Sequence, residues 1–476
     1  MATGPARGGS ANHIDGEWTH SPSTLEVTDL AEGGVFAELP AATPAQAQQA
    51  VEAAAAAQRA MRETTIVERA GWMESVADGI RARTEELVDV IVREAGKPVA
   101  SARSEVAAAA ERFERAAGEA RNQQGEYLEG TTAGHEGWEA VVKPEPVGTV
   151  LCVTPYNYPL ATTALQVAPA LAAGNSVVLK PATKTPVSGA ILAEIITEAG
   201  VPDGGFNFIV GHASDIGDTL ASDERLDAVA LTGSTGAGKH VARESGMVTL
   251  HMELGGNAPA LIFPDADLDR AAADCAKGSF KYAGQRCSAI ARVLAHEAVH
   301  DEVVAGIEAE MDDWRPGDLF DESTAVGPLI SEEQADWVEE LIADAVDRGA
   351  QLVRGGDRDG RTVEPTLLAE VPHDARILHE EQFGPVAAVA AVADETEALA
   401  LANADDFGLD AAVFTADHDR AMRLADDIEA GAVRINGAPS HGNGDIPFGG
   451  VGDSGIGREG IGYTIEAFTT TKSIVL

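Results

Sequence analysis

The sequence predicts an α/β protein with two strand-and-helix domains, and three observations lead to this prediction. Apolar runs of strand length alternate with helix-forming runs between residues 148 and 234. A second alternating series begins after residue 254. The chain has 476 residues, enough for two or three domains with cores of their own. Alternation of this kind favours parallel sheets covered by helices on both faces.

A long alanine-rich tract comes first, from residue 43 to residue 121. Its composition favours helix throughout, and its mixture of apolar and charged residues suits helices packed at a surface. The segment "AGKPVA" interrupts the tract, because Gly96 and Pro98 end one helix and allow another to begin. We therefore expect a helical layer broken once, at residues 95–100.

The first alternating series contains four expected strands: "GTVLCVTP", "SVVLKP", "FNFIVG" and "DAVALTGS". Between them, "TTALQVAPALAAG" and "SGAILAEIITEAG" read as helices that end at Gly174 and Gly200. Parallel sheets of this type bind ligands at the carboxyl ends of their strands, often on a helix N-terminus. We expect the site there.

The second series contains the apolar runs "PALIF", "ARVLAH", "PVAAVAAV", "AAVFTA" and "GAVRIN". The chain then ends in "EAFTTTKSIVL", a stretch rich in β-branched residues with no helix after it. An unpaired strand of this composition would be prone to aggregate. We expect it to complete a sheet, with a neighbouring subunit as one candidate partner.

The charge of the chain is unusual. It carries 77 Asp and Glu against 34 Lys and Arg, a net charge of −43, and only eight of the cations are lysine. The acids are interspersed with periodic apolar residues, so they predict a hydrated acidic surface and not disorder. Such a surface suits the cytoplasm of a halophile, where salt screens its self-repulsion. Nucleic acid and anionic membranes are excluded as expected partners.

The cysteines and the absence of apolar spans point to a soluble protein of a reducing compartment. Cys152, Cys275 and Cys287 are odd in number and form no CxxC pair, which argues against a disulfide framework and against a zinc site. No signal-peptide core and no run of about 18 apolar residues occurs. We expect a cytoplasmic location and no metal.

Two glycine motifs are misleading when read alone. "GSTGAGKH" nearly matches the phosphate loop of nucleotide triphosphatases, but His240 stands where a hydroxyl should bind magnesium. The segment still predicts a strand, a glycine turn and a helix N-terminus that can face a phosphate. "GIGREG" matches GxGxxG by letter, yet no clear strand leads into it and only 16 residues follow. A turn-rich loop is the favoured interpretation.

Cys287 is the cysteine whose surroundings suggest chemistry. It follows Arg286 in the polar segment "GQRCSA", whereas Cys152 lies in an apolar strand and Cys275 on a helix. A neighbouring guanidinium and a helix N-terminus both favour the thiolate, the reactive form. The alternative is a small apolar side chain beside an accidental charge, and this segment alone leaves both open.

Two further residues are candidates by context. Glu253 ends a short apolar strand in "HMELGGNAP", where apolar surroundings would raise its pKa and suit a general base. Asn157 follows a buried strand in "TPYNYP", where a rigid side-chain amide could donate to a developing oxyanion. Each has an ordinary alternative: an exposed glutamate at a strand end, and a turn asparagine.

Together these segments resemble the NAD(P)+-dependent aldehyde dehydrogenase superfamily over almost the whole chain, from "HIDGEW" to the end. "TPYNYP" is similar to the family's oxyanion segment, which gives that role to Asn157. "MELGGNAP" resembles the general-base segment and "GQRCSA" the nucleophile segment. The resemblance thus implies that Glu253 is the base and Cys287 the nucleophile, 34 residues apart as in the family pattern.

Other motifs resemble the family's cofactor-binding segments: "VVLKPATKTP", "LTGSTGAG" and "EEQFGPV". The resemblance implies that these residues bind the cofactor: Lys180, Thr183, Gly233, Ser234, Gly238, Glu381 and Phe383. Glu381 would hold the nicotinamide ribose and Phe383 would lie against the ring. "PFGGVGDSGIGREG" is similar to the family's closing loop, which explains the false GxGxxG.

Thr183 bears on the choice between NADP and NAD. NAD-preferring relatives often carry a glutamate at this place, which would repel a 2′-phosphate. Threonine removes that repulsion, and Lys180 and Lys184 add positive charge in a chain with little lysine. We predict that NADP is accepted and preferred over NAD.

The chain is most similar to the branch of non-phosphorylating glyceraldehyde-3-phosphate dehydrogenases, which also includes lactaldehyde dehydrogenases. In that branch an arginine before the nucleophile and a tyrosine after the asparagine help to hold a substrate phosphate, and Arg286 and Tyr158 fit those places. A further arginine expected near the C-terminus is absent, with Arg458 only a few residues upstream. Lactaldehyde, succinate semialdehyde and sugar-acid semialdehydes therefore stay open beside glyceraldehyde-3-phosphate.

The resemblance also implies a domain plan. A Rossmann-like cofactor domain would comprise residues 1–126 and 147–253, and an α/β catalytic domain residues 254–446. A small β oligomerisation arm would comprise residues 127–146 and 461–476, and would form a homodimer or homotetramer. The alternative from another class is a non-catalytic binding protein of the same fold.

Overall fold

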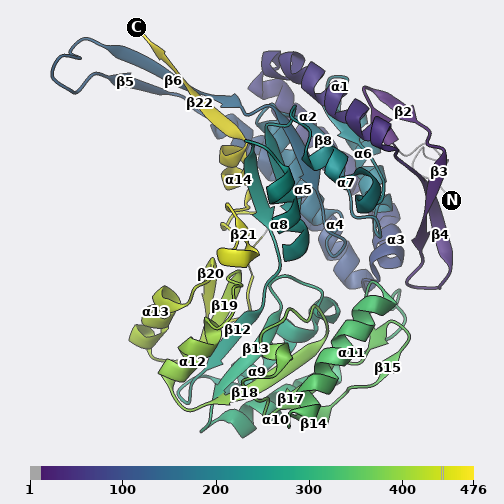
Figure 1. Cartoon of the computed structure of the whole chain (residues 1–476), viewed down its shortest axis with the longest axis vertical. Helices are drawn as coiled ribbons and strands as arrows, with labels where there is room; N and C mark the ends of the chain where they lie inside the picture. The colour runs from purple at the N-terminus through teal and green to yellow at the C-terminus, as the bar shows by residue number, and fades with distance from the viewer. Residues whose placement is uncertain (1–11, 441, 443) are drawn as a thin grey trace.

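Two large sheets organise the molecule, one in each half of Figure 1, and each sheet with the helices around it is called a domain below, numbered in chain order. The computed structural model describes residues 12–440, 442 and 444–476. The first sheet has the order β2-β1-β9-β8-β7-β10-β11-β21, and β7 to β11 are parallel. Its strands are β1 (Asn12–Ile14), β2 (Glu17–Thr19), β7 (Thr149–Val153), β8 (Ser176–Lys180), β9 (Phe206–Phe208), β10 (Ala228–Thr232), β11 (Thr249–Glu253) and β21 (Gly455–Ile456).

The second sheet has the order β14-β17-β18-β13-β12-β19-β20 and is parallel except for β14. Its strands are β12 (Ala258–Ile262), β13 (Ile290–His296), β14 (Gln351–Arg354), β17 (Thr366–Ala369), β18 (Val386–Val392), β19 (Asp410–Phe414) and β20 (Ala432–Ile435). The pairs β3 (Ser23–Thr28) with β4 (Val35–Ala41) and β15 (Arg358–Asp359) with β16 (Thr362–Val363) stand apart. Every strand expected in the two alternating series is present, and the chain passes from one sheet to the other between β11 and β12.

The alanine-rich tract forms four helices, where one break was expected. They are α1 (Pro44–Glu63), α2 (Ile66–Ala82), α3 (Thr84–Ala95) and α4 (Val99–Asn122). The break at Gly96 is confirmed, and its φ of 67° is a left-handed conformation that glycine adopts at little cost. The breaks before α2 and before α3 were both missed, although Thr65 and Glu68 form a capping box at the start of α2.

Helices cover both faces of each sheet. The first sheet is flanked by α5 (Ala161–Ala172), α6 (Val187–Glu198), α7 (Ala213–Ala221) and α8 (Thr235–Glu244), besides the four helices above. Around the second sheet lie α9 (Leu268–Phe280), α10 (His300–Glu310), α11 (Glu332–Asp347), α12 (Glu395–Ala402) and α13 (His418–Asp427). Helix α5 is buried on every side, which agrees with its mostly apolar sequence and its lack of charged residues. It packs between the sheet and the outer helix α4.

A three-stranded sheet projects from the first domain at the upper left of Figure 1. It consists of β5 (Glu126–Glu129), β6 (Glu139–Pro146) and the C-terminal strand β22 (Thr469–Val475), in the order β22-β6-β5. The tail thus completes a sheet within its own chain. Within residues 461–476 only β22 lies in this sheet, because α14 (Ile461–Ala467) packs against α4 and α5.

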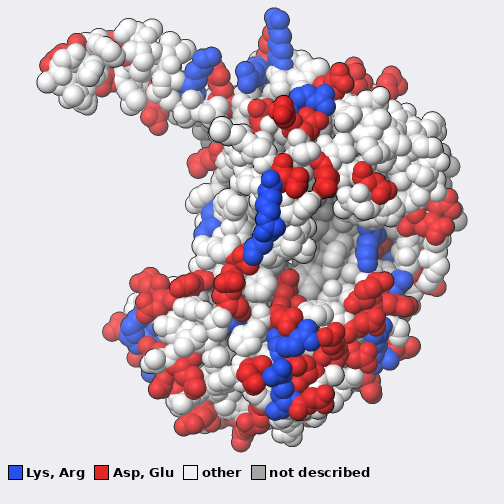
Figure 2. Space-filling model, in the orientation of Figure 1, with Lys and Arg blue, Asp and Glu red and all other residues white. Residues whose placement is uncertain are grey.

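Acidic side chains are spread over the face of the molecule shown in Figure 2, most densely on the second domain, whereas the projecting sheet is mostly uncharged. A hollow lies between the two domains in the same view. Among residues 12–440, 442 and 444–476, no helix is long and apolar enough to cross a membrane.

Candidate active site

Two adjoining cavities lie where the domains meet, at the carboxyl ends of β7, β10 and β11. One has a volume of about 530 Å³ and extends toward α4; the other, of about 840 Å³, extends toward the turn after β10. Both are bordered by Tyr158, Thr162, Cys287, Phe448 and Glu459. A group at this border can face both a small substrate and a larger ligand.

Cys287 lies at that border, in a loop that follows a segment of strained backbone. The short helix η2 (Lys281–Gly284) precedes it, and both Tyr282 and Ala283 have left-handed φ values, of 56° and 50°. No helix begins at Cys287, because the chain turns and enters β13 at Ile290. The helix N-terminus expected to favour the thiolate is therefore absent.

The electrostatics at Cys287 also differ from the expectation. Burial raises the pKa of its thiol, and the carboxylates of Asp410 and Glu253 raise it further. The Arg286 guanidinium is directed to the end of α9, where Nη2 donates to the carbonyl oxygen of Gly278 at 2.5 Å. The guanidinium thus points toward α9, and the effect of its charge on the thiol stays a prediction.

Glu253 is the last residue of β11, and only 1% of its surface is exposed. The alternative of an exposed strand-end glutamate is excluded. Burial raises the pKa of Glu253 well above its usual value, and the negative charge of Glu459 adds to the rise. Gly449 passes so close that a Cβ there would lie 2.7 Å from Oε1 of Glu253. The carboxyl is thereby held in a dry, tightly bounded place.

Asn157 follows β7 and is also buried. Its Nδ2 donates to the carbonyl oxygen of Gln285 at 2.9 Å, and its Oδ1 accepts from the backbone N–H of Tyr158 at 3.1 Å. The side chain therefore connects the loop after β7 to the segment just before Cys287. An amide has two N–H donors, so one stays available for an oxygen atom in the cavity.

The turn after β10 forms one wall of the larger cavity. Gly233 and Ser234 line it, and Ser234 begins α8 as the N-cap, accepting from the backbone N–H of Ala237. This places a helix N-terminus at the cavity, which suits a phosphate. Gly238 lies in the next turn of α8, outside the cavity wall, where a Cβ would collide with Leu254. It serves close packing of the helix.

Glu381 and Phe383 form the opposite wall of the larger cavity. Oε1 of Glu381 accepts from the backbone N–H of Gly256 at 3.0 Å, and burial raises the pKa of this carboxyl to about 7. A Cβ on Gly255 would come within 2.7 Å of its other oxygen, so glycine keeps the cradle open. The Phe383 ring packs edge-on against Tyr156, with 6.0 Å between centroids.

Lys180 is the last residue of β8, and Thr183 lies in the loop that follows. Burial lowers the pKa of Lys180 to about 8, and its Nζ donates to the carbonyl oxygen of Pro181 at 3.3 Å. Thr183 lines a third cavity of about 800 Å³ with Lys184 and with Arg361 from the second domain. The Lys184 ammonium lies 3.9 Å from Glu333, and the charge of Arg361 acts on the same carboxylate.

The geometry of α8 argues against a phosphate loop of the kind found in nucleotide triphosphatases. Lys239, the residue that would reach a nucleotide phosphate, forms an ion pair with Asp453. His240 is exposed, and its Nε2 lies 2.7 Å from Asp218. The "GIGREG" segment is the expected turn-rich loop, except that Gly455–Ile456 forms the two-residue edge strand β21.

Two residues at the site were missed in the sequence. Glu459 is buried and borders both cavities, and burial raises its pKa to about 7 although the Arg112 guanidinium opposes the rise. Arg112 lies on α4 and lines the smaller cavity, and its Nε has no hydrogen-bond partner among the residues described. An arginine in a charged helix gives no local signal, whereas Glu459 stood in a motif that was set aside as a loop.

The arrangement fits a dinucleotide cofactor in the larger cavity: a helix N-terminus at one wall, and a buried carboxylate in a glycine cradle at the other. Cys287 and Asn157 lie in two different loops, and Glu253 ends β11. Cys287 and Asn157 border the larger cavity, and the Glu253 charge acts on the Cys287 thiol. This set can support attack on a carbonyl, stabilisation of the oxyanion and activation of water.

Comparison with known proteins identifies the family. Residues 18–474 match the Aldehyde dehydrogenase family. The chain is 38% identical to the NADP-dependent glyceraldehyde-3-phosphate dehydrogenase of Streptococcus equinus, over 98% of each chain. It is 40% identical to a succinate-semialdehyde dehydrogenase of Paenarthrobacter nicotinovorans, over 92% of this chain and 98% of that protein.

Among solved structures, the NADP complex of the NADP-dependent glyceraldehyde-3-phosphate dehydrogenase from Bacillus halodurans superimposes with a TM-score of 0.96. It is 36% identical, with 98% of each chain covered. These matches confirm the resemblance and the fold class expected from the sequence. The chain belongs to the aldehyde dehydrogenase family and is an oxidoreductase that oxidises small aldehydes with NADP or NAD.

Proposed function

We propose that this enzyme oxidises a small anionic aldehyde to its carboxylic acid with NADP as the preferred cofactor. The observation that carries the proposal is the pair of guanidinium groups of Arg112 and Arg286 in the wall of the smaller cavity. Among the described residues, the buried Nε atoms of both lack a hydrogen-bond partner. Unpaired buried donors are costly, and an anionic substrate group would satisfy them.

The chemistry begins at Cys287. Its thiolate attacks the aldehyde carbon, and the oxygen of the resulting thiohemiacetal accepts a hydrogen bond from Nδ2 of Asn157. The bound cofactor supplies the hydride acceptor. Loss of hydride from the former aldehyde carbon leaves a thioester on Cys287, and Glu253 takes a proton from the water that hydrolyses it. Its raised pKa suits a base that works near neutral pH.

The remaining predicted residues have supporting roles in this proposal. Gly233 and Ser234 would face the phosphates of the bound cofactor, Glu381 would accept hydrogen bonds from a ribose, and Phe383 would lie against the nicotinamide. Tyr158 borders both cavities and assists Arg286 on the substrate side.

Phosphate is the first candidate for the anionic group, since Lys281, Arg112 and Arg286 line the smaller cavity. A carboxylate is the second candidate. It is favoured by the absence of a C-terminal arginine in the cavity, because Arg458 donates instead to the carbonyl oxygens of Gly450 and Gly457. The comparison of kcat/KM for glyceraldehyde-3-phosphate, glyceraldehyde and succinate semialdehyde separates the two. A ratio near one between the first two would remove the phosphate assignment.

The cofactor preference rests on Thr183 and the third cavity. Lys184, His212 and Arg361 line that cavity beside Thr183. Replacing Thr183 with glutamate would place a carboxylate there. We expect Thr183→Glu to raise the KM for NADP at least about tenfold while the KM for NAD changes little. An unchanged ratio of the two KM values would contradict the preference.

We also propose a cytoplasmic, salt-adapted homo-oligomer. All three cysteines are free, as a reducing compartment requires. The acidic surface supports the adaptation to salt. The projecting sheet supports assembly, because it exposes Tyr127, Leu128, Trp138, Ile474 and Val475.

A further inference from the structure

A buried ion pair lies in the wall of the smaller cavity. Lys97 follows the break between α3 and α4, Glu105 is on α4, and neither is more than 3% exposed. The Lys97 ammonium donates to Oε2 of Glu105. Burying two charges costs so much desolvation that a pair of this kind is often no more stabilising than apolar residues. A role beyond stability is therefore a reasonable expectation.

The second oxygen of Glu105 holds the loop that carries the oxyanion donor. Oε1 accepts from the backbone N–H groups of Leu160 and Ala161, at 3.0 and 3.1 Å. These groups begin α5 and have no partner within the helix. Because Asn157 lies three residues before Leu160, this carboxylate anchors the end of its loop.

The Lys97 ammonium reaches the aromatic rings of both catalytic segments. Nζ lies 3.6 Å from the ring centroid of Tyr158 and 4.3 Å from that of Tyr282. Tyr158 follows Asn157 directly, and Tyr282 is a strained residue in the segment that leads to Cys287. The Tyr282 hydroxyl donates to the carbonyl oxygen of Ala95 at 3.0 Å, which ties this segment to the end of α3 beside Lys97.

We propose that Lys97, with Glu105, is a positioning residue that sets the distance between the Asn157 amide and the Cys287 thiol. The proposal rests on the roles given above to these two residues. One charged group contacts the two segments whose relative placement decides whether the attacking sulfur and the oxyanion donor meet the same carbonyl. It acts through Tyr158, Tyr282 and Glu105 and needs no contact with the substrate.

The test uses the double variant Lys97→Met/Glu105→Gln in the full-length protein. It leaves no unpaired buried charge, and glutamine keeps an oxygen for the N–H groups of Leu160 and Ala161. We expect kcat to fall about 100-fold because the segments lose their common contact. The dissociation constant for NADP should change less than twofold, since Lys97 does not line the larger cavity. Lys97→Arg, which keeps the charge, should recover part of the kcat.

Lys277→Met is the matched control, because it removes an exposed lysine from α9, the helix that leads into the same segment. It should leave kcat unchanged. A double variant with the kcat of the wild type would overturn the proposal, whatever its melting temperature, since a purely structural pair would change stability alone.

A second readout keeps this result separate from the proposed function. Hydrogen exchange at the amides of Leu160 and Ala161 and the alkylation rate of Cys287 by iodoacetamide need no turnover. If the wild type oxidises no aldehyde, the proposed function fails. The positioning role is then supported by faster exchange together with a changed alkylation rate in the double variant, and overturned by unchanged values of both.

Discussion

Negative charge dominates the surroundings of Cys287, and this gives a prediction about its reactivity. After burial, Asp410 and Glu253 are the largest contributors to the raised pKa of the thiol. Glu253→Gln removes one of these charges and should lower that pKa. We expect iodoacetamide to alkylate Cys287 severalfold faster at pH 7.5 in this variant than in the wild type. Glu297→Gln, an exposed change, serves as control, and a slower reaction in Glu253→Gln would contradict the account.

The pH dependence of turnover should report the buried carboxyls. A general base acts as the carboxylate, so its activity is lost as the pH falls through its own pKa. Because burial and Glu459 raise the pKa of Glu253, the loss should occur well above pH 4.5, the usual value. Measurement of kcat from pH 5 to 9 checks this. A flat profile down to pH 5 would be inconsistent with Glu253 as the base.

Residues in contiguous motifs were found from the sequence, and residues brought in by folding were not. Asn157, Glu253 and Cys287 each follow or end a recognisable strand or turn. Arg112 and Glu105 lie in an even, charged helical pattern in which nothing distinguishes the buried face near the cavity from the rest. The sequence also placed Arg286 beside the thiol, but adjacency along the chain says nothing about where a long side chain turns.

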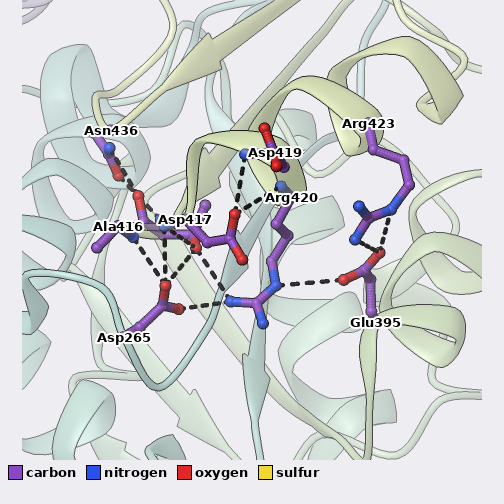
Figure 3. Close-up of polar contacts among 9 residues, drawn as sticks. Asp265, Glu395, Ala416, Asp417, Asp419, Arg420, Arg423 and Asn436 are labelled. Carbon is purple, nitrogen blue, oxygen red and sulfur yellow. Dashed lines mark hydrogen bonds and ion pairs between the residues drawn. The ribbon is translucent and has the colours of Figure 1, made fainter.

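At the scale of elements, a polar network fastens α13 to the second sheet (Figure 3). Oδ2 of Asp265 accepts from the hydroxyl of Thr415 and from the backbone N–H groups of Ala416 and Asp417, at 2.8 to 3.1 Å. Its other oxygen lies 2.7 Å from Nη1 of Arg420. The loops after β12 and β19 are thus joined by one carboxylate.

Asp265→Ala should lower the free energy of unfolding by about 0.5–1.5 kcal/mol, because it removes the hydrogen bonds from Thr415 and from two exposed backbone N–H groups. Burial tends to raise the pKa of Asp265, but the hydrogen bond from Thr415 and the charge of Arg420 leave it lowered overall. The contribution is therefore present above the unfolded-state pKa of about 4 and disappears as the pH falls through the folded value. Urea unfolding at pH 7 measures this change, with Asp269→Ala as an exposed control. Equal free energies of unfolding for both variants and the wild type would contradict the prediction.

The same elements show how much of the fold could be predicted from the sequence. Every strand of the alternating series was predicted, since buried parallel strands read as continuous apolar runs. The break at Thr65 was missed because alanine-rich sequence hides a boundary that capping side chains alone mark. The position of α14 against α5 was missed because it depends on packing between segments about 300 residues apart.

At the scale of the whole molecule, the net charge and the buried carboxyls both lower the stability of the fold at neutral and higher pH. Burial raises the pKa of Glu94, Glu381 and Glu459 to about 7. A raised folded-state pKa gives stability that is present below about pH 4.5 and lost as the pH rises through 7. The net charge of −43 adds repulsion that salt screens. We expect the melting temperature to rise by several degrees from pH 8 to pH 6 and from 0.1 to 2 M KCl; a fall with salt would contradict the proposed adaptation.

The projecting sheet should govern assembly. Tyr127 and Leu128 are adjacent exposed residues on its edge strand β5. Tyr127→Glu/Leu128→Glu should convert the proposed oligomer into monomers, as measured by light scattering in 2 M KCl, because two charges would be desolvated in an interface. Val67→Glu, an exposed change on α2, should leave the mass unchanged. A monomeric wild type would refute this prediction.

The most direct test of the central claim, that Cys287 carries the acyl group and Glu253 releases it, is a single-turnover experiment on Glu253→Gln. Excess aldehyde and NADP should give a burst of one NADPH per active site, followed by turnover at least about 100-fold slower than in the wild type. Mass spectrometry of the quenched enzyme should find the acyl mass on the peptide that contains Cys287. Steady turnover at the wild-type rate, or an acyl mass on another residue, would contradict the account.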